Sequence, residues 1–323
     1  MDALRTPNAR FVGLSDYAFA PHYREVRARD GAALRFHFLD EGPRGAAPVL
    51  LLHGNPTWCY LYRPVVAGLV ARGHRVVALD LMGMGRSDKP VDEDEFTIEA
   101  HLDWMGQWLE AEDLSDVTLF CQDWGGILGL CLLPDHGDRF ARVVVSNTGL
   151  PEGRGMNRFM QDWLAFSQSQ DELPVGALVQ AGSTRELTDA EMAAYEAPFP
   201  DGSFQASPKR FPLLIPLQPD NPGVPRATAT GAFLESWTKP NTVKLSHIGV
   251  VSSCAAEWLE EACIGPAFVR PCLGRGADPD VPTDAGRRGG RRLRTDRVAE
   301  PVTAGPCHGV LLHRDGAALR RLL

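Results

Sequence analysis

The stretch Phe120-Cys121-Gln122-Asp123-Trp124-Gly125-Gly126 decides the fold of this chain. Residues 117–120 form a short apolar, β-prone run, and residues 127–133 form an apolar run that can begin a helix. A strand, a sharp turn and a helix are the context of a nucleophile elbow, whose usual pattern is G-x-S-x-G. Asp123 stands at the place of the serine, so we expect a carboxylate at a strained turn with small neighbours.

An aspartate at such a turn changes the chemistry that the turn supports. A carboxylate needs no deprotonation and can attack an alkyl carbon directly, which leaves an alkyl ester on the enzyme. The alternative is a tight turn in which Asp123 only caps the following helix. The remaining motifs of the chain favour the first interpretation.

Length, charge and composition limit the class of protein. With 323 residues, the chain can form one large α/β domain with an insertion, or two domains. Its net charge of −8 argues against nucleic acid and anionic membranes as partners. We find no apolar run that could span a bilayer and no apolar signal core in residues 1–7. We therefore expect a cytoplasmic protein whose seven cysteines are reduced thiols, without zinc spacing.

The chain divides into two parts by pattern. Up to Gly149 strands alternate with helices, which predicts a mostly parallel central sheet flanked by helices. The predicted strands are 23–28, 34–39, 48–52, 75–80, 117–120 and 142–147, and the predicted helices are 61–71 and 97–112. Helices predicted at 156–167, within 181–200 and at 230–237 then occur among many Pro and Gly residues. We interpret residues 151–228 as an inserted helical cap, and residues 1–150 and 229–323 as the main domain.

Two loops follow predicted buried strands. His53-Gly54-Asn55-Pro56-Thr57-Trp58 comes directly after the strand at 48–52, which places backbone amides at the carboxyl edge of the sheet. The alternative for this loop is a plain turn between a strand and a helix. The second loop, residues 83–90, is rich in glycine but lacks the strand–GxGxxG–helix arrangement of a dinucleotide site.

Four motifs together resemble the haloalkane dehalogenases of the α/β-hydrolase superfamily. They are the loop at 53–58, the loop at 83–90, Gln122-Asp123-Trp124-Gly125-Gly126, and Ala197-Pro198-Phe199-Pro200-Asp201. The resemblance extends from about Arg5 to Pro240 and implies the α/β-hydrolase fold with a helical cap. In that family an aspartate displaces halide from a small haloalkane, and a histidine-activated water hydrolyses the ester to a primary alcohol. The resemblance implies no metal or organic cofactor.

The resemblance also implies roles for individual residues. Asp123 is the expected nucleophile, and Trp124 is the expected halide donor because an indole N–H donates without accepting. Trp163 is the best second donor, with a packing tryptophan as the alternative, and Asn55 is a third candidate. The backbone amides of Asn55 and Trp124 would form the oxyanion hole.

The base and the acid fall in the last part of the chain. His308, in Pro306-Cys307-His308-Gly309, is our candidate for the base, with His313 as the runner-up. The resemblance implies an orienting acid after one of two strands, and residues 146–149, which follow the first, contain no carboxylate. The resemblance therefore implies Asp278, in Gly276-Ala277-Asp278-Pro279, which lies 30 positions before His308. Surface positions in an irregular tail are the alternative for these residues.

The family pattern ends abruptly near Asn241. A buried strand is expected directly after Pro240, but a polar segment, scattered cysteines and the Arg/Gly-rich run 287–294 follow instead. We hypothesise that part of this tail is translated out of frame or is otherwise aberrant. Sequencing the source DNA and that of close relatives tests this hypothesis, and relatives with the same tail in the same frame would refute it.

The sequence therefore predicts a monomeric haloalkane dehalogenase that uses a small haloalkane and water and releases halide. One alternative is an epoxide hydrolase, which also has an aspartate elbow but needs acidic lid tyrosines, and residues 152–228 contain only Tyr195. Another alternative is an inactive relative, because the tail departs from the family. The preferred chain length and halogen depend on packing that the sequence does not show.

Overall fold

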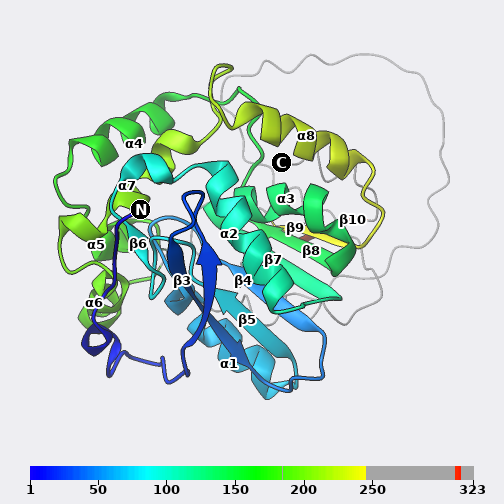
Figure 1. Ribbon diagram of the computed structural model, residues 1–323, viewed down its shortest axis with the longest axis horizontal. Coiled ribbons are helices and arrows are strands. Elements are labelled where there is room, and N and C mark those ends of the chain that lie inside the picture. The colour runs from blue at the N-terminus through cyan, green and yellow to red at the C-terminus, as the bar shows by residue number, and fades with distance from the viewer. Residues whose placement is uncertain (184, 245–309, 314–323) are drawn as a thin grey trace, which may run out of the picture.

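A central sheet organises the molecule. The computed structural model describes residues 1–183, 185–244 and 310–313. The strands of the sheet are β2 (His22–Arg27), β3 (Ala33–Glu41), β4 (Pro48–Leu52), β5 (Arg75–Leu79), β7 (Val117–Gln122), β8 (Phe140–Ser146), β9 (Asn241–Lys244) and β10 (Val310–His313). Their order is β10-β9-β8-β7-β4-β5-β3-β2 (Figure 1). The pairs from β5 to β9 are parallel, and β2–β3, β3–β5 and β9–β10 are antiparallel, which confirms the predicted mostly parallel sheet.

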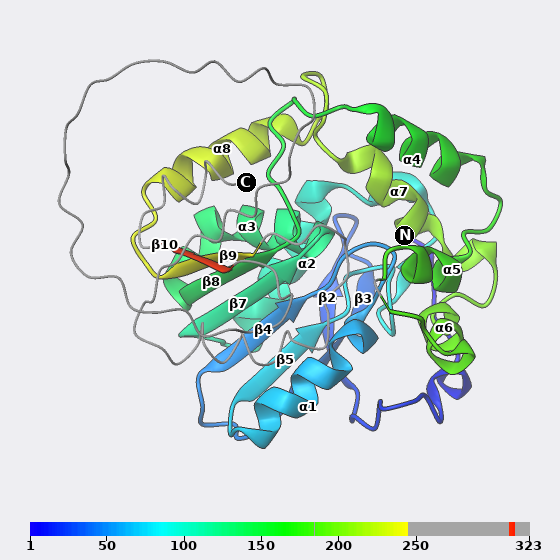
Figure 2. The same cartoon turned by 180° about the vertical axis from the view of Figure 1, so that it is seen from behind.

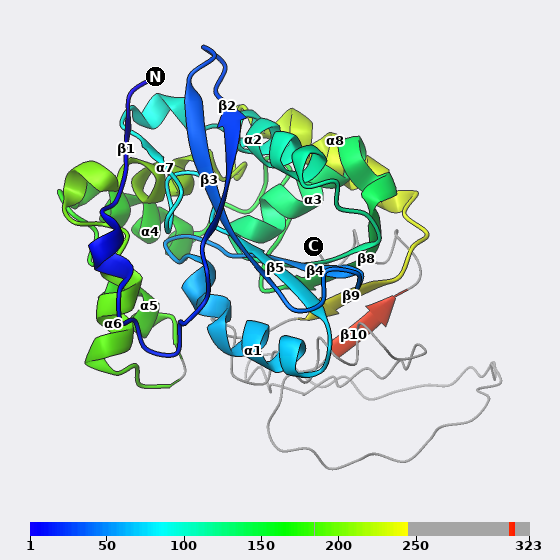
Figure 3. The same cartoon turned by 60° about the horizontal axis from the view of Figure 1, so that its bottom comes forward.

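Helices cover both faces of this sheet. Helix α1 (Arg63–Ala71) lies on one face, and α2 (Ile98–Ala111), α3 (Trp124–His136) and α8 (Val224–Glu235) lie on the other (Figure 3). Every residue of β4 and β7 is buried, as expected for strands enclosed between two helical layers. The sheet therefore holds the loops at its carboxyl edge in fixed positions.

Four further helices lie between β8 and α8 along the chain. They are α4 (Arg158–Ser169), α5 (Val175–Ala181), α6 (Asp189–Glu196) and α7 (Ala206–Leu214). They gather together beside the sheet (Figures 1 and 2). Helices α5 and α7 were not predicted, and the predicted start of α8 was 230 instead of Val224. The reason is that α5 contains a glycine, α7 contains two prolines, and α8 contains one of each. The short elements are β1 (Ala3–Leu4), β6 (Lys89–Pro90), η1 (Asn8–Phe11), η2 (Cys59–Tyr62), η3 (Glu93–Glu95), η4 (Gly137–Arg139) and η5 (Gly202–Phe204).

Polar contacts attach the helices between β8 and α8 to the rest of the molecule. The guanidinium of Arg63 pairs with the carboxylate of Glu191, which also completes a capping box with Thr188 at the start of α6. The indole of Trp58 donates to the carbonyl of Ala194 at 3.1 Å. The hydrogen bonds from Arg185 are the main reason why the pKa of Glu191 falls to about 2, so this carboxylate is ionised at neutral pH.

The strand β9 corrects one expectation. The sequence predicts an end of the regular pattern at Asn241, but Asn241–Lys244 forms a strand parallel to β8. Val143 pairs with Asn241 in this register. Asn241–Lys244 is too polar to show a strand pattern in the sequence. Pairing with β8 stabilises the strand although its own β propensity is weak.

Two further features of the described residues concern membrane crossing and the cysteines. No helix in the described part of the chain is long and apolar enough to cross a membrane. Cys59, Cys121 and Cys131 are buried free thiols.

Candidate active site

The turn at Asp123 has the geometry of a nucleophile elbow. Asp123 follows β7 and precedes α3, with φ 53° and ψ −126°, a conformation that L-residues rarely adopt. A Cβ atom at Gly125 would lie 2.3 Å from the carbonyl oxygen of Leu52, and one at Gly126 would lie 2.4 Å from the side chain of Thr148. The two glycines therefore allow α3 to pass close to the neighbouring strand.

Backbone amides hold the carboxylate of Asp123. The amide of Asn55 donates to Oδ1 at 2.8 Å, and the amide of Trp124 also bonds the carboxylate. A Cβ atom at Gly54 would lie 2.2 Å from Oδ1, so only glycine leaves room for this contact. The hydroxyl of Thr148 donates to the carbonyl of Asp123 at 2.6 Å and supports the turn from behind. The structure thus brings together the three residues predicted for nucleophile and oxyanion hole.

The electrostatics of Asp123 result from two opposing effects. Burial raises the pKa of Asp123 above its ordinary value, because a charged carboxylate loses hydration in this site. The amides of Trp124 and Asn55 counteract this rise, since they stabilise the ionised form. The N-terminus of α3 adds a positive field at the same place.

Trp124 directly follows Asp123 and is the first residue of α3. Its side chain is 3% exposed, and its ring contacts Phe211 of α7 with centroids 4.7 Å apart. Its indole N–H is a donor that cannot accept, which suits an anion in an apolar pocket.

The other two candidate halide donors have different positions. The side-chain amide of Asn55 donates to the carbonyl of Pro208 in α7 at 3.2 Å, so one of its two N–H groups already holds that helix. Trp163 lies half-buried on α4 and stacks on Phe166 with centroids 6.0 Å apart. Among the described residues, Trp163 makes no hydrogen bond or ring contact with Asp123 or Trp124.

His53, in the loop directly after β4, is not available as a base. His53 is fully buried, its Nδ1–H donates to the carbonyl of Gly54 at 2.9 Å, and its Nε2 accepts from the amide of Leu81 at 3.0 Å. Burial lowers the pKa of His53, so the neutral ring serves the loop. His308 and Asp278 lie outside the described residues. His313 is the last residue of β10, whose side chains are not described.

One group of potential metal ligands occurs in the described part of the chain. It consists of His37, Cys59 and Asp80, whose ligand atoms lie within 4.8 Å of one another. Asp80 already accepts hydrogen bonds from the His37 ring at 2.7 Å and from the amides of Cys59 and Arg86, both at 2.8 Å. This carboxylate therefore organises the glycine-rich loop, and we assign no metal to it.

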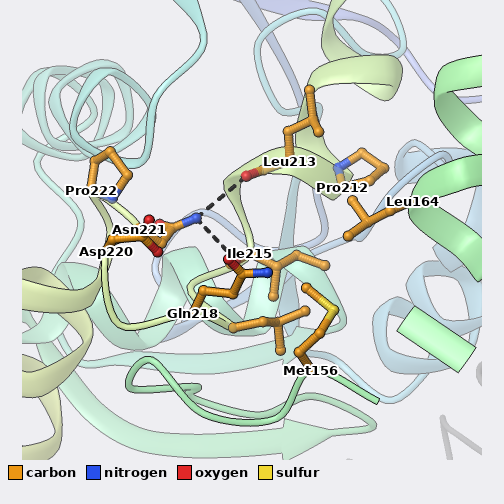
Figure 4. Close-up of a pocket in the computed structure, with 10 residues that line it drawn as sticks. Met156, Leu164, Pro212, Leu213, Ile215, Gln218, Asp220, Asn221 and Pro222 are labelled. Carbon is orange, nitrogen blue, oxygen red and sulfur yellow. Dashed lines mark hydrogen bonds between the residues drawn. The ribbon is translucent and has the colours of Figure 1, made fainter. Parts of the chain in front are cut away.

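A cavity of about 320 Å³ lies between α4, α7 and the segment that follows α7 (Figure 4). Asn221 holds this segment, because its side-chain amide donates to the carbonyls of Leu213 and Ile215 at 3.4 and 3.2 Å (Figure 4). Asp123 and Trp124 do not line the cavity, so it is distinct from the elbow. The lining residues are Met156, Leu164, Pro212, Leu213, Ile215, Leu217, Gln218, Asp220, Asn221 and Pro222.

The sheet order and the strained turn with its two amides define the class of protein. Residues 47–212 match the family described as alpha/beta hydrolase fold. A haloalkane dehalogenase of Psychrobacter cryohalolentis is 48% identical over 241 residues, which cover 74% of this chain and 80% of that protein. One of Mycobacterium marinum is 47% identical over 241 residues, covering 74% and 81%. The tetrameric haloalkane dehalogenase DpaA from Paraglaciecola agarilytica superposes with a TM-score of 0.72 at 35% identity, covering 82% of this chain and 89% of that one.

This chain therefore belongs to the haloalkane dehalogenases, hydrolases that act on carbon–halide bonds. DbeA from Bradyrhizobium elkani, at 21% identity and a TM-score of 0.61, shows the shared fold alone. The supporting residues Thr148, Pro208 and Phe211 were not predicted. Thr148 directly follows the predicted strand at 142–147, which is the one signal that could have indicated it. Pro208 and Phe211 gave no signal, because only the packing of α7 brings them to the site.

Proposed function

We propose that Asp123 carries out the first step of haloalkane hydrolysis. An oxygen of the ionised carboxylate attacks the carbon that bears the halogen. The new C–O bond forms as the carbon–halogen bond breaks, and the halide leaves with the bonding electron pair. The observation that carries this proposal is the carboxylate at the strained elbow, held by the amides of Asn55 and Trp124 beside a buried indole.

The indole N–H of Trp124 stabilises the leaving halide in this proposal. A fixed donor in a site with little water interacts with developing negative charge more strongly than water does. Trp163 and Asn55 are the further candidate donors. The contact between Asn55 and Pro208 makes Asn55 the weaker candidate, because one of its N–H groups is already used.

The second step hydrolyses the ester. His308 takes a proton from a water that attacks the ester carbonyl, and Asp278 orients the histidine. The same amides of Asn55 and Trp124 then stabilise the oxyanion. The bond from the carbonyl carbon to the alkyl oxygen breaks, His308 returns its proton to the leaving alkoxide to give the alcohol, and the acid left on Asp123 ionises to the carboxylate and releases a proton to solvent. Residues 151–228 would form the cap over the site, and residues 1–150 and 229–323 the main domain. The assignments of His308, Asp278 and the two domains rest on the sequence, as do the predicted monomer and cytoplasmic location.

The lid tyrosine argues against the epoxide hydrolase alternative. Tyr195 is 3% exposed and its ring packs edge-on against Tyr60 with centroids 5.2 Å apart. Burial raises its pKa to about 12, so it is a poor acid for an epoxide oxygen.

Bromide release from dibromoethane, measured beside the intact protein mass, tests the proposed function. We expect steady release of bromide, with the alcohol as the organic product, because both half-reactions are proposed to work. The absence of both release and a covalent adduct would overturn the assignment of Asp123. Epoxide opening without halide release would favour the alternative enzyme.

Replacing Trp124 with phenylalanine should weaken halide binding about 10- to 100-fold, because a hydrogen bond to a charged group is lost. Phenylalanine keeps an aromatic ring beside Phe211 but lacks the pyrrole part of the indole and its N–H. Chloride affinity measured by calorimetry checks this prediction. Trp108→Phe is the matched control, since Trp108 is also a buried tryptophan and packs on Phe38 of the sheet. Unchanged chloride affinity in Trp124→Phe would contradict the role of the indole.

A further inference from the structure

Three buried rings connect α2 to the indole beside the nucleophile. His101 of α2 stacks on Phe211 of α7 with centroids 4.8 Å apart and an interplanar angle of 22°. Phe211 in turn contacts the ring of Trp124 at 4.7 Å and 48°. Each of the three side chains is at most 3% exposed. A ring from α7 thus contacts rings from two helices that cover the sheet.

His101 behaves as a flat neutral ring in this position. Phe96 stacks on it at 5.8 Å, and Trp104 meets it edge-on at 5.4 Å. Neither ring nitrogen has a hydrogen-bond partner among the residues that the structure describes. Burial lowers the pKa of His101 to about 3, so the ring is uncharged at neutral pH. These surroundings indicate stacking, and not acid–base chemistry, as the role of the imidazole.

We propose that His101 is a positioning residue for the halide site: its ring holds Phe211 against Trp124 and so fixes the direction of the indole N–H. The proposal rests on the proposed function, in which Trp124 binds the leaving halide. A hydrogen bond weakens steeply when the N–H points away from its acceptor, so a change in the tilt of the indole lowers halide affinity.

The anchoring of α7 supports this role. The hydroxyl of Ser207 donates to the carbonyl of Met82 at 3.1 Å, and the carbonyl of Pro208 accepts from Asn55. The backbone around Phe211 is therefore tied to loops at the carboxyl edge of the sheet. With the backbone fixed, the rings on either side determine where the phenyl group lies.

Three variants test the proposal through the dissociation constant of chloride. His101→Leu removes the flat ring, and we expect chloride binding to weaken about 2- to 10-fold, the equivalent of one aromatic pair. His101→Phe restores the ring without its nitrogens, and we expect it to restore wild-type affinity. Trp108→Leu is the control, because it removes another buried ring of α2 that packs on Phe38 instead of Phe211. If His101→Leu does not fold, Phe211→Leu removes the same stack from α7 and should weaken chloride equally.

Several results would overturn the proposal. Equal weakening in His101→Leu and Trp108→Leu would indicate a general effect of core damage, and unchanged affinity in His101→Leu would show that the ring is not needed. Failure of His101→Phe to restore binding would assign the effect to the nitrogens. A failure of the proposed function would give a different pattern of affinities. If wild type and Trp124→Phe bind chloride equally, Trp124 does not bind the halide, and both proposals are wrong.

Discussion

Asp123→Asn should abolish bromide release while the protein stays folded. Asparagine tolerates φ 53° and keeps an oxygen that can accept from the amide of Asn55, but its amide group is not a nucleophile. We expect kcat to fall at least about 1,000-fold. Asp116→Asn is the matched control, because Asp116 has the same φ of 53° but is exposed and lies just before β7, at the opposite end of the strand from Asp123. Bromide release near the wild-type rate in Asp123→Asn would contradict the assignment of the nucleophile.

The same variant should reveal the raised pKa of Asp123 through stability. A carboxyl whose pKa is raised by folding contributes its full stability only below the unfolded value of about 3.9, and loses that contribution as pH rises through the folded value. Asparagine does not ionise. The unfolding free energy of Asp123→Asn, relative to wild type, should therefore rise between pH 4 and pH 7. Denaturant melts at several pH values measure this difference, and a difference that falls with pH would show that the folded pKa is not raised.

The variant His308→Ala should release one equivalent of bromide and then stop. Alkylation of Asp123 does not need a base, whereas attack of water on the ester does. We expect turnover to fall at least about 1,000-fold, with an alkyl adduct visible in the intact mass after exposure to dibromoethane. His136→Ala is the control, because His136 lies at the far end of α3 and pairs with Glu110. Continued turnover in His308→Ala would rule out His308 as the base.

The wild-type protein provides a second comparison in the same experiment. A single equivalent of bromide and a lasting adduct in wild type would show that the chain lacks a working base, which would overturn the role of His308. That result would agree with the hypothesis of an out-of-frame tail. Steady wild-type turnover combined with arrest in His308→Ala would instead place the base at His308.

Much of the fold could be predicted because its elements have strong local patterns. The run Pro48–Leu52 is apolar throughout, as a strand buried on both faces must be, and the structure confirms its bounds. The helix predicted at 97–112 is observed as Ile98–Ala111, with Thr97 as its N-cap. The turn at Asp123 was predictable because the small residues that a nucleophile elbow requires, Gly125 and Gly126, follow the aspartate in the sequence.

Other elements have no such pattern. Helix α7 carries Pro208 and Pro212, which are unfavourable for a helix by themselves, but Pro208 falls in its first turn, where an amide donor is not needed. Contacts with the main sheet loops, such as that between Ser207 and Met82, compensate for its weak propensity. Strand β9 depends in the same way on pairing with β8.

The sequence by itself determined the sheet and the sharp turn at Asp123, the residue that we propose as the nucleophile. It also determined the two amides that hold the carboxylate, because these groups are adjacent to motifs whose spacing fixes their geometry. Only the tertiary structure decided that Asn55 holds α7 through Pro208, that Tyr195 is buried against Tyr60, and that His101 and Phe211 stand behind Trp124. These contacts join residues far apart in the chain, and their existence depends on the packing of whole helices, which no local pattern of residues encodes.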